Sequence, residues 1–202
     1  MTALVSIESA RYFGATLRVV YIQSIISDLY KILQAYQEEG IILIKDGFDM
    51  PKLKDHPEID SAHHNQAIAI NDCLNQFKDA ADFIVVADWD DIFLTGFESE
   101  LGVGALGPAY NKGLNVADFF IDQRSKDSTI GAFILEWMKT ERSDMIGKYA
   151  MVPAAVKSAS VHYPLVMEGG YKQKKYHETD GVIVYHLNKK HEDLQRRLFS
   201  PK

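Results

Sequence analysis

The sequence has a single cysteine, no basic run and no long apolar segment. Cys73 stands alone among 202 residues, which excludes an internal disulfide and a metal cluster built from cysteines. The 22 basic and 28 acidic residues give a net charge of −6, and both signs are scattered along the chain. Nucleic acid or an anionic membrane would call for a concentrated basic patch instead. No stretch approaches the ~20 apolar residues that cross a bilayer, and the first residues are too polar for a secretory signal.

What is present is the composition of one globular domain, with 47% hydrophobic and 25% charged residues. In the first half, runs rich in β-branched residues alternate with segments of helical periodicity. This pattern predicts strands at 17–22, 41–44 and 83–87, and helices at 7–14, 28–39 and 65–77. Strands separated by helices form βαβ units. We therefore expect an α/β fold, with a mostly parallel sheet covered by helices on both faces.

The second half is less regular. The alternation weakens after Leu94, and a glycine-rich segment leads to Asp118-Phe119-Phe120-Ile121, which we predict to be a strand. Residues 130–139 predict an amphipathic helix that contains Trp137, and scattered short strands follow. No linker divides the chain, so we expect residues 1–202 to form a single domain.

Three carboxylates follow the third predicted strand within four positions, because Val85-Val86-Ala87 ends in Asp88-Trp89-Asp90-Asp91. Parallel sheets bind ligands outside the carboxyl ends of their strands. Clustered carboxylates repel one another unless a cation or strong donors neutralise them. Asp88 and Asp90 could therefore share one octahedral Mn²⁺ or Mg²⁺, whose other positions would take phosphate oxygens and water. The alternative is an ordinary turn whose acids are solvated or cap the next element.

Several further segments, in collinear order over nearly the whole chain, carry a family resemblance. They are Phe13-Gly14-Ala15, Val20-Tyr21-Ile22-Gln23-Ser24, Asn65-Gln66-Ala67, Asn71-Asp72-Cys73-Leu74, Gly147-Lys148-Tyr149, Val161-His162-Tyr163-Pro164 and His186-Leu187. Together with the acidic segment that begins at Asp88, they resemble glycosyltransferase family 92 as found in animals. The resemblance implies a GT-A-type, Rossmann-like fold. It also implies inverting transfer of a hexose from a nucleotide-sugar donor to a glycan acceptor, with UDP-galactose the donor of the best-known members.

The resemblance also implies Mn²⁺ or another divalent cation as cofactor, and a place on the lumenal side of the Golgi membrane. Compared with the family, the chain begins at what looks like the first helix. We therefore expect it to lack the family's membrane anchor and its first core strand. A sheet without that strand would expose its neighbour's backbone groups, which leads us to expect weaker nucleotide binding.

Individual roles follow from the resemblance. Asp88 and Asp90 are the expected ligands of the metal and, through it, of the donor's diphosphate. Asp91 would hold a group behind the metal ligands or a sugar hydroxyl, or it would cap the turn. His162 and His186 are candidates for a late metal ligand, because a neutral imidazole binds Mn²⁺ well.

Gln66 and Asp72 of the third helix are the candidates for a contact with the donor. At ~3.6 residues per turn, these two positions lie ~120° apart, so at most one of them faces the donor. An inverting transfer also needs a general base near the acceptor hydroxyl. The spacing does not choose among the five candidate acids, which are Asp118, Asp122, Asp127, Glu136 and Asp144.

Two other functions fit part of the pattern. A catalytically impaired relative would bind a glycan or a partner protein and transfer nothing. A metal-dependent hydrolase or nucleotidyltransferase would fit the acidic segment but not the collinear resemblance.

Overall fold

The computed structural model describes residues 2–48, 65–95, 115–137, 147–177, 180 and 182–186. The described helices are α1 (Thr2–Tyr12), α2 (Ser27–Glu38), α3 (Gln66–Phe77), α4 (Val116–Lys126) and the short 3₁₀ helix η2 (Pro153–Ala155). The described strands are β1 (Arg18–Ile22), β2 (Ile42–Asp46), β3 (Ile84–Val86), β4 (Asp91–Thr95), β5 (Ile130–Leu135), β6 (Lys148–Met151), β7 (Val156–Ala159), β8 (Pro164–Met167), β9 (Lys172–Tyr176) and β10 (Val182–His186). None of the helices in these ranges has the length and apolar character needed to span a membrane.

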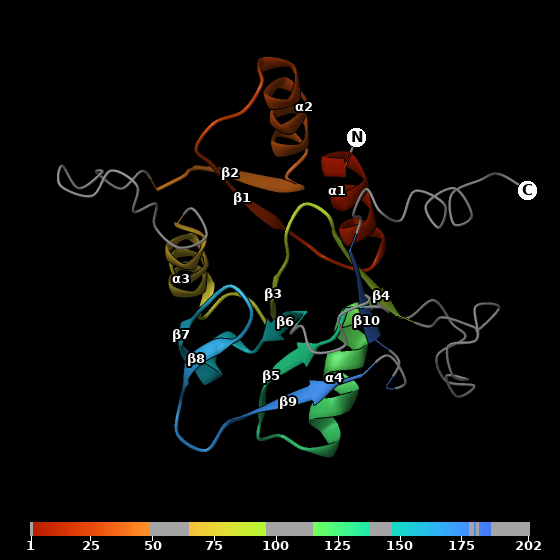
Figure 1. Cartoon of the computed structure of the whole chain (residues 1–202), viewed down its shortest axis with the longest axis vertical. Helices are drawn as coiled ribbons and strands as arrows, with labels where there is room; N and C mark the ends of the chain where they lie inside the picture. The colour runs from red at the N-terminus through yellow and green to blue at the C-terminus, as the bar shows by residue number, and fades with distance from the viewer. Residues whose placement is uncertain are drawn as a thin grey trace, which may run out of the picture.

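The first βαβ unit is formed as the sequence predicts. β1 and β2 are parallel, from Arg18 beside Ile42 to Ile22 beside Asp46, and α2 connects them at the top of Figure 1. Leu33 of α2 is fully buried and belongs to one apolar cluster with Ile7 of α1, Val20 and Ile42. The periodic face of α2 therefore packs on the parallel pair.

The third predicted strand forms as β3, but it belongs to another sheet. β3 pairs antiparallel with β6, and the strand order is β3-β6-β5-β9, with β5 and β9 parallel. In this sheet β3 is an edge strand, and its Val85 is 41% exposed. The α/β class is thus observed, but the single mostly parallel sheet predicted through 17–22, 41–44 and 83–87 is not. A three-residue apolar run does not indicate whether its partner strand is parallel or antiparallel. Here the partner is β6, residues 148–151, and it is antiparallel.

Two predictions for the second half are wrong. Residues 118–121, predicted to be a strand, lie inside α4. The side chain of Asn115 caps this helix by accepting a hydrogen bond from Ala117 N, and Val116, Phe119 and Phe120 face the core. Turn by turn, this is the helical spacing of i, i+3 and i+4.

Residues 130–139, predicted to be a helix, begin instead with β5, in which all six residues are buried. A strand covered on both faces is apolar at every position, so its pattern resembles that of a buried helix. Trp137, placed in that predicted helix, forms an isolated parallel bridge with Val184 of β10.

The largest core joins α4 to the four-stranded sheet. The rings of Phe120 and Phe133 lie 4.5 Å apart, those of Phe133 and Tyr176 5.8 Å, and those of Phe119 and Tyr176 5.2 Å. Val182 and Val184 of β10 belong to the same cluster. β10 pairs antiparallel with β4, and this ladder ends where Asp91 is in register with His186. The aromatic core therefore supports the strand that leaves the acidic segment.

Candidate active site at the acidic turn

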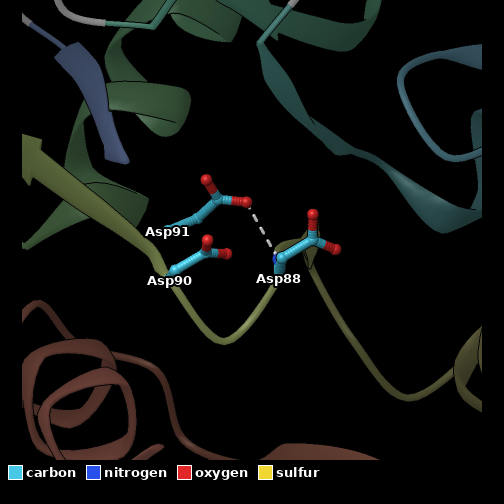
Figure 2. A group of neighbouring side chains, drawn as sticks. All are labelled: Asp88, Asp90 and Asp91. Carbon is cyan, nitrogen blue, oxygen red and sulfur yellow. Dashed lines mark hydrogen bonds between the residues drawn. The ribbon is translucent and has the colours of Figure 1, made fainter. Parts of the chain in front are cut away.

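The segment Asp88–Asp91, here called the acidic turn, connects β3 to β4. One oxygen atom from each of Asp88, Asp90 and Asp91 lies within 4.8 Å of the others, and Figure 2 shows the three side chains around the bend of the chain. The backbone N–H of Asp88 donates a hydrogen bond to Oδ2 of Asp91 at 2.9 Å, and Asp91 N donates to Asp88 O at 3.3 Å. Asp91 is buried and caps the turn, whereas Asp88 and Asp90 are partly exposed.

A fully buried lysine faces the turn from the four-stranded sheet. Nζ of Lys148, the first residue of β6, lies 2.8 Å from Oδ2 of Asp88 and 3.9 Å from Oδ2 of Asp91. The Asp88 contact is an ion pair whose angles are not those of a hydrogen bond. A buried charge is costly unless it is paired, so this ammonium and these carboxylates depend on one another.

A second basic residue reaches the turn from β1. Arg18 contacts the carbonyl oxygen of Asp88 through Nη2 at 3.5 Å, and its guanidinium carbon lies 4.5 Å from the centre of the Trp89 ring. Nη1 donates to the carbonyl oxygen and to Oγ of Ser6 in α1, at 3.0 and 2.7 Å. Burial lowers the pKa of Arg18 to about 10, a shift that the charges of Asp91 and Asp88 oppose. Arg18 therefore joins α1, β1 and the acidic turn.

The two candidate histidine ligands are placed differently. His162 is partly buried, and its Nδ1 lies 3.1 Å from the carbonyl oxygen of Gly147. A carbonyl oxygen can only accept, so Nδ1 of His162 donates this hydrogen bond. This is the usual arrangement of a metal-binding histidine, although His162 is not part of the carboxylate group. For His186 the structure describes the backbone alone, in register with Asp91.

Asp72 is a candidate for a donor contact, but side chains of the neighbouring strands β1 and β2 bind its carboxylate. Tyr21 of β1 donates its hydroxyl hydrogen bond to Oδ2 of Asp72 at 2.6 Å, and Lys45 of β2 forms an ion pair with the same oxygen. The contact with Lys45, followed by that with Tyr21, holds the pKa of Asp72 below its usual value. Asp72 thus fastens α3 to the carboxyl ends of β1 and β2. Gln66, in the first turn of α3, is exposed.

Four of the five candidate bases are described. Asp118 is exposed on α4, and Asp122 forms an ion pair with Lys126 at 2.6 Å. Asp127 pairs with Lys172 at 2.7 Å. Glu136 pairs with Lys175 and with Nδ1 of His177, both at 2.8 Å. Asp144 lies outside the described residues.

Their surroundings distinguish Glu136 from the others. Burial raises the pKa of Glu136, but Lys175 and His177 outweigh burial and hold it below the usual value. Glu136 precedes Trp137, whose ring makes an edge contact with the ring of His162 at 6.3 Å. The carboxylate of Glu136 itself is bound by Lys175 and His177.

Sequence reasoning missed the roles of Arg18 and Lys148. Lys148 carried part of the family resemblance, but no role was expected for it. The feature that could have indicated a role is that Lys148 begins the strand Lys148-Tyr149-Ala150-Met151, which is buried at all four positions. A lysine in such a run requires a carboxylate partner.

The comparison with known families decides the identity. The family model described as "Glycosyltransferase family 92" matches residues 3–200. The chain belongs to glycosyltransferase family 92. The collinear resemblance seen in the sequence is thereby confirmed.

Curated relatives cover most of this chain but only part of their own length. Glycosyltransferase family 92 protein F59C6.8 of Caenorhabditis elegans is 28% identical over 207 residues, which cover 91% of this chain and 38% of the relative. Family 92 protein F13G3.3 of the same organism is 27% identical, over 80% of this chain and 34% of the relative. A galactan beta-1,4-galactosyltransferase of Arabidopsis thaliana, GALS2, is 22% identical, over 87% of this chain and 34% of its own length. The chain thus spans 34–38% of the length of these three relatives. No solved structure matches it significantly.

Proposed function

We propose that this chain forms the donor-binding part of a metal-dependent, inverting hexosyltransferase with a GT-A-type site. In this proposal the enzyme moves galactose from UDP-galactose to a glycan acceptor on the lumenal side of the Golgi membrane. Membership of a glycosyltransferase family supports sugar transfer, and the name of the plant relative supports galactose. The observation that carries the proposal is the acidic turn, where three carboxylates meet within 4.8 Å directly after an apolar strand.

The residues of the turn fit a divalent cation. Carboxylate oxygens suit Mn²⁺ and Mg²⁺, and one oxygen from each of the three acids lies within 4.8 Å of the others. Lys148 contacts one oxygen of Asp88, and the turn's own backbone contacts one oxygen of Asp91. We propose Asp88 and Asp90 as the ligands of the ion, as the family resemblance implies, with His162 and His186 as candidates for a later ligand.

A cation in this position would neutralise the charge that develops on the departing diphosphate. The protein's own residues would do the rest. Asp88 and Asp90 would orient the ion, and Arg18 would hold the turn in place through the Asp88 carbonyl and Trp89. One of the five candidate acids would take the proton from the acceptor hydroxyl.

The test is a calorimetric titration of uridine diphosphate (UDP) into the purified chain with and without Mn²⁺. Asp88→Asn and Asp90→Asn each remove a charge while keeping nearly the same shape. We expect each to weaken Mn²⁺-dependent UDP binding by at least about tenfold, which equals about 1.4 kcal/mol. Asp28→Asn is the matched control, because Asp28 is an exposed carboxylate on α2 whose partner is Lys31. It should leave binding unchanged.

Two results would contradict the proposal. If the wild-type chain binds UDP equally well without metal, the acids are an ordinary solvated turn. If both substitutions leave Mn²⁺-dependent binding intact, the ion is held elsewhere. A chain that binds a glycan but neither binds nor hydrolyses UDP-galactose would be the catalytically impaired relative instead.

A further inference from the structure

The strand pairing brings Lys148 to the acidic turn. β6 runs antiparallel to β3, with Tyr149 in register with Val86 at the carboxyl end of β3. Lys148 is the residue before Tyr149, so it lies beside the point where β3 gives way to the turn. The position of the ammonium group beside Asp88 is thus fixed by an inner strand of the sheet, and the side chain that carries it is fully buried.

Two basic side chains of the described residues approach the acidic turn. Nζ of Lys148 lies 2.8 Å from Oδ2 of Asp88 and 3.9 Å from Oδ2 of Asp91, and Arg18 contacts the carbonyl oxygen of Asp88. A divalent cation bound by Asp88 would therefore share this carboxylate with the buried ammonium of Lys148, which lies 2.8 Å from it.

We propose that Lys148 is a positioning residue that competes with the divalent cation for the carboxylates of the acidic turn. The inference depends on the proposed function and adds that the metal and the donor bind cooperatively. The ammonium group weakens the binding of the metal alone, because both cations act on Asp88. A diphosphate brings negative charge that both cations attract, so metal and donor bind firmly only together.

Thermodynamic linkage makes this coupling measurable. If UDP raises the affinity for Mn²⁺ by some factor, Mn²⁺ must raise the affinity for UDP by the same factor. Removal of the ammonium should strengthen Mn²⁺ binding in the absence of UDP and reduce the coupling factor. A residue that only stabilises the fold would give the opposite result, because its loss would weaken metal binding in every condition.

The experiment compares Lys148→Met with wild type by calorimetry. Met keeps the length and apolar stem of the side chain and removes the charge. We expect Lys148→Met to bind Mn²⁺ at least about threefold more tightly without UDP, and the coupling factor to fall by a similar amount. Lys148→Arg, which keeps a positive charge, is the matched control, and it should retain weak metal binding and strong coupling.

A second measurement covers the case in which the variant is unstable. Lys148→Met leaves the buried carboxylate of Asp91 without its ammonium neighbour, which destabilises the folded state. If the cation and the ammonium act on the same groups, Mn²⁺ should raise the melting temperature of Lys148→Met more than that of wild type, and EDTA should reverse the rise. A variant that stays unfolded in Mn²⁺ would overturn the proposal.

The remaining outcomes separate the two proposals. If wild type binds no Mn²⁺ even with UDP, the proposed function is wrong. If wild type shows coupled binding while Lys148→Met binds the metal alone equally or more weakly, with no larger thermal shift, the inference about Lys148 is wrong and the proposed function stands.

Discussion

The guanidinium carbon of Arg18 lies 4.5 Å from the centre of the Trp89 ring, and this contact fastens β1 to the acidic turn. The two residues belong to parts of the fold that share no strand pairing among the described residues, since β1 pairs with β2 and the turn connects β3 to β4. The same guanidinium donates to Ser6 of α1. One side chain therefore fixes the position of the turn relative to the amino-terminal βαβ unit.

Arg18→Met should destabilise the protein strongly. It removes the donors to Ser6 and Asp88, and it leaves Asp88 and Asp91 with less positive charge nearby. We expect the free energy of unfolding in urea to fall by about 2 to 4 kcal/mol, because acceptors on Ser6 and Asp88 lose a charged donor and each unmade hydrogen bond costs about 1–3 kcal/mol. Arg11→Met, at an exposed position of α1, is the control and should change it by no more than about 0.5 kcal/mol. Equal effects of the two substitutions would show that Arg18 does not hold the turn.

Asp91 is expected to act on folding more than on metal binding. Asp91→Ala removes the acceptor for the backbone N–H of Asp88, and an unsatisfied buried donor costs about 1–3 kcal/mol. Asp91→Asn keeps an acceptor oxygen in the same place and should lose less. Urea unfolding of both variants measures the difference. If Asp91→Ala is as stable as wild type but cannot bind Mn²⁺, Asp91 is a metal ligand rather than the cap of the turn.

Gly147 has no room for a side chain. A Cβ atom there would lie 2.3 Å from the carbonyl oxygen of Leu135 and 2.9 Å from the backbone nitrogen of Trp137. Gly147→Ala must push β6 away from β5, so we expect it to lower the free energy of unfolding by about 1–3 kcal/mol, as overpacking does elsewhere. Gly169→Ala is the control, because a Cβ atom at Gly169 meets nothing within 4 Å. Thermal melting that ranks the two variants equally would contradict the close packing at Gly147.

Asp127 should contribute stability that is lost in acid. The ammonium of Lys172, and then the hydroxyl of Thr129, lower the pKa of Asp127 to about 2. An unfolded Asp has a pKa of about 3.9, so the contribution is complete above that value and disappears as the pH falls towards 2. The pKa itself can be measured by NMR titration of the carboxyl carbon. Lys172→Met should move it back towards the unfolded value, whereas Lys174→Met should not, because Lys174 lies over the ring of Tyr176.

Local elements were predictable from the sequence where one face is apolar. Leu29, Ile32, Leu33 and Tyr36 recur at helical spacing, and α2 forms there with Leu33 fully buried. The helix predicted over 130–139 is wrong because β5, which occupies residues 130–135, is buried on both faces and its sequence shows no alternation. Periodicity reports the difference between two faces, so it fails where both faces are covered.

The contacts around the acidic turn were less predictable. That Asp88, Asp90 and Asp91 lie together follows from their adjacency in the chain. Their partner Lys148 comes from a strand far along the sequence, which pairs with β3 in a direction that the apolar run does not encode. Long-range strand pairing is decided by the packing of the whole sheet. The acidic motif alone therefore identifies the carboxylates but not the lysine that pairs with them.

The pairing of β4 with β10 also determines when the acidic turn can reach its folded surroundings during synthesis. The strand that leaves the acidic turn pairs with Val182–His186, near the carboxyl end of the sequence, and Lys148 arrives only with β6. A ribosome that has made the chain only as far as the acidic turn has produced the carboxylates and Arg18, but neither Lys148 nor the strand that pairs with β4. Contacts of such high sequence separation form late and slowly. The nascent chain therefore carries the acidic turn without Lys148 until β6 has emerged.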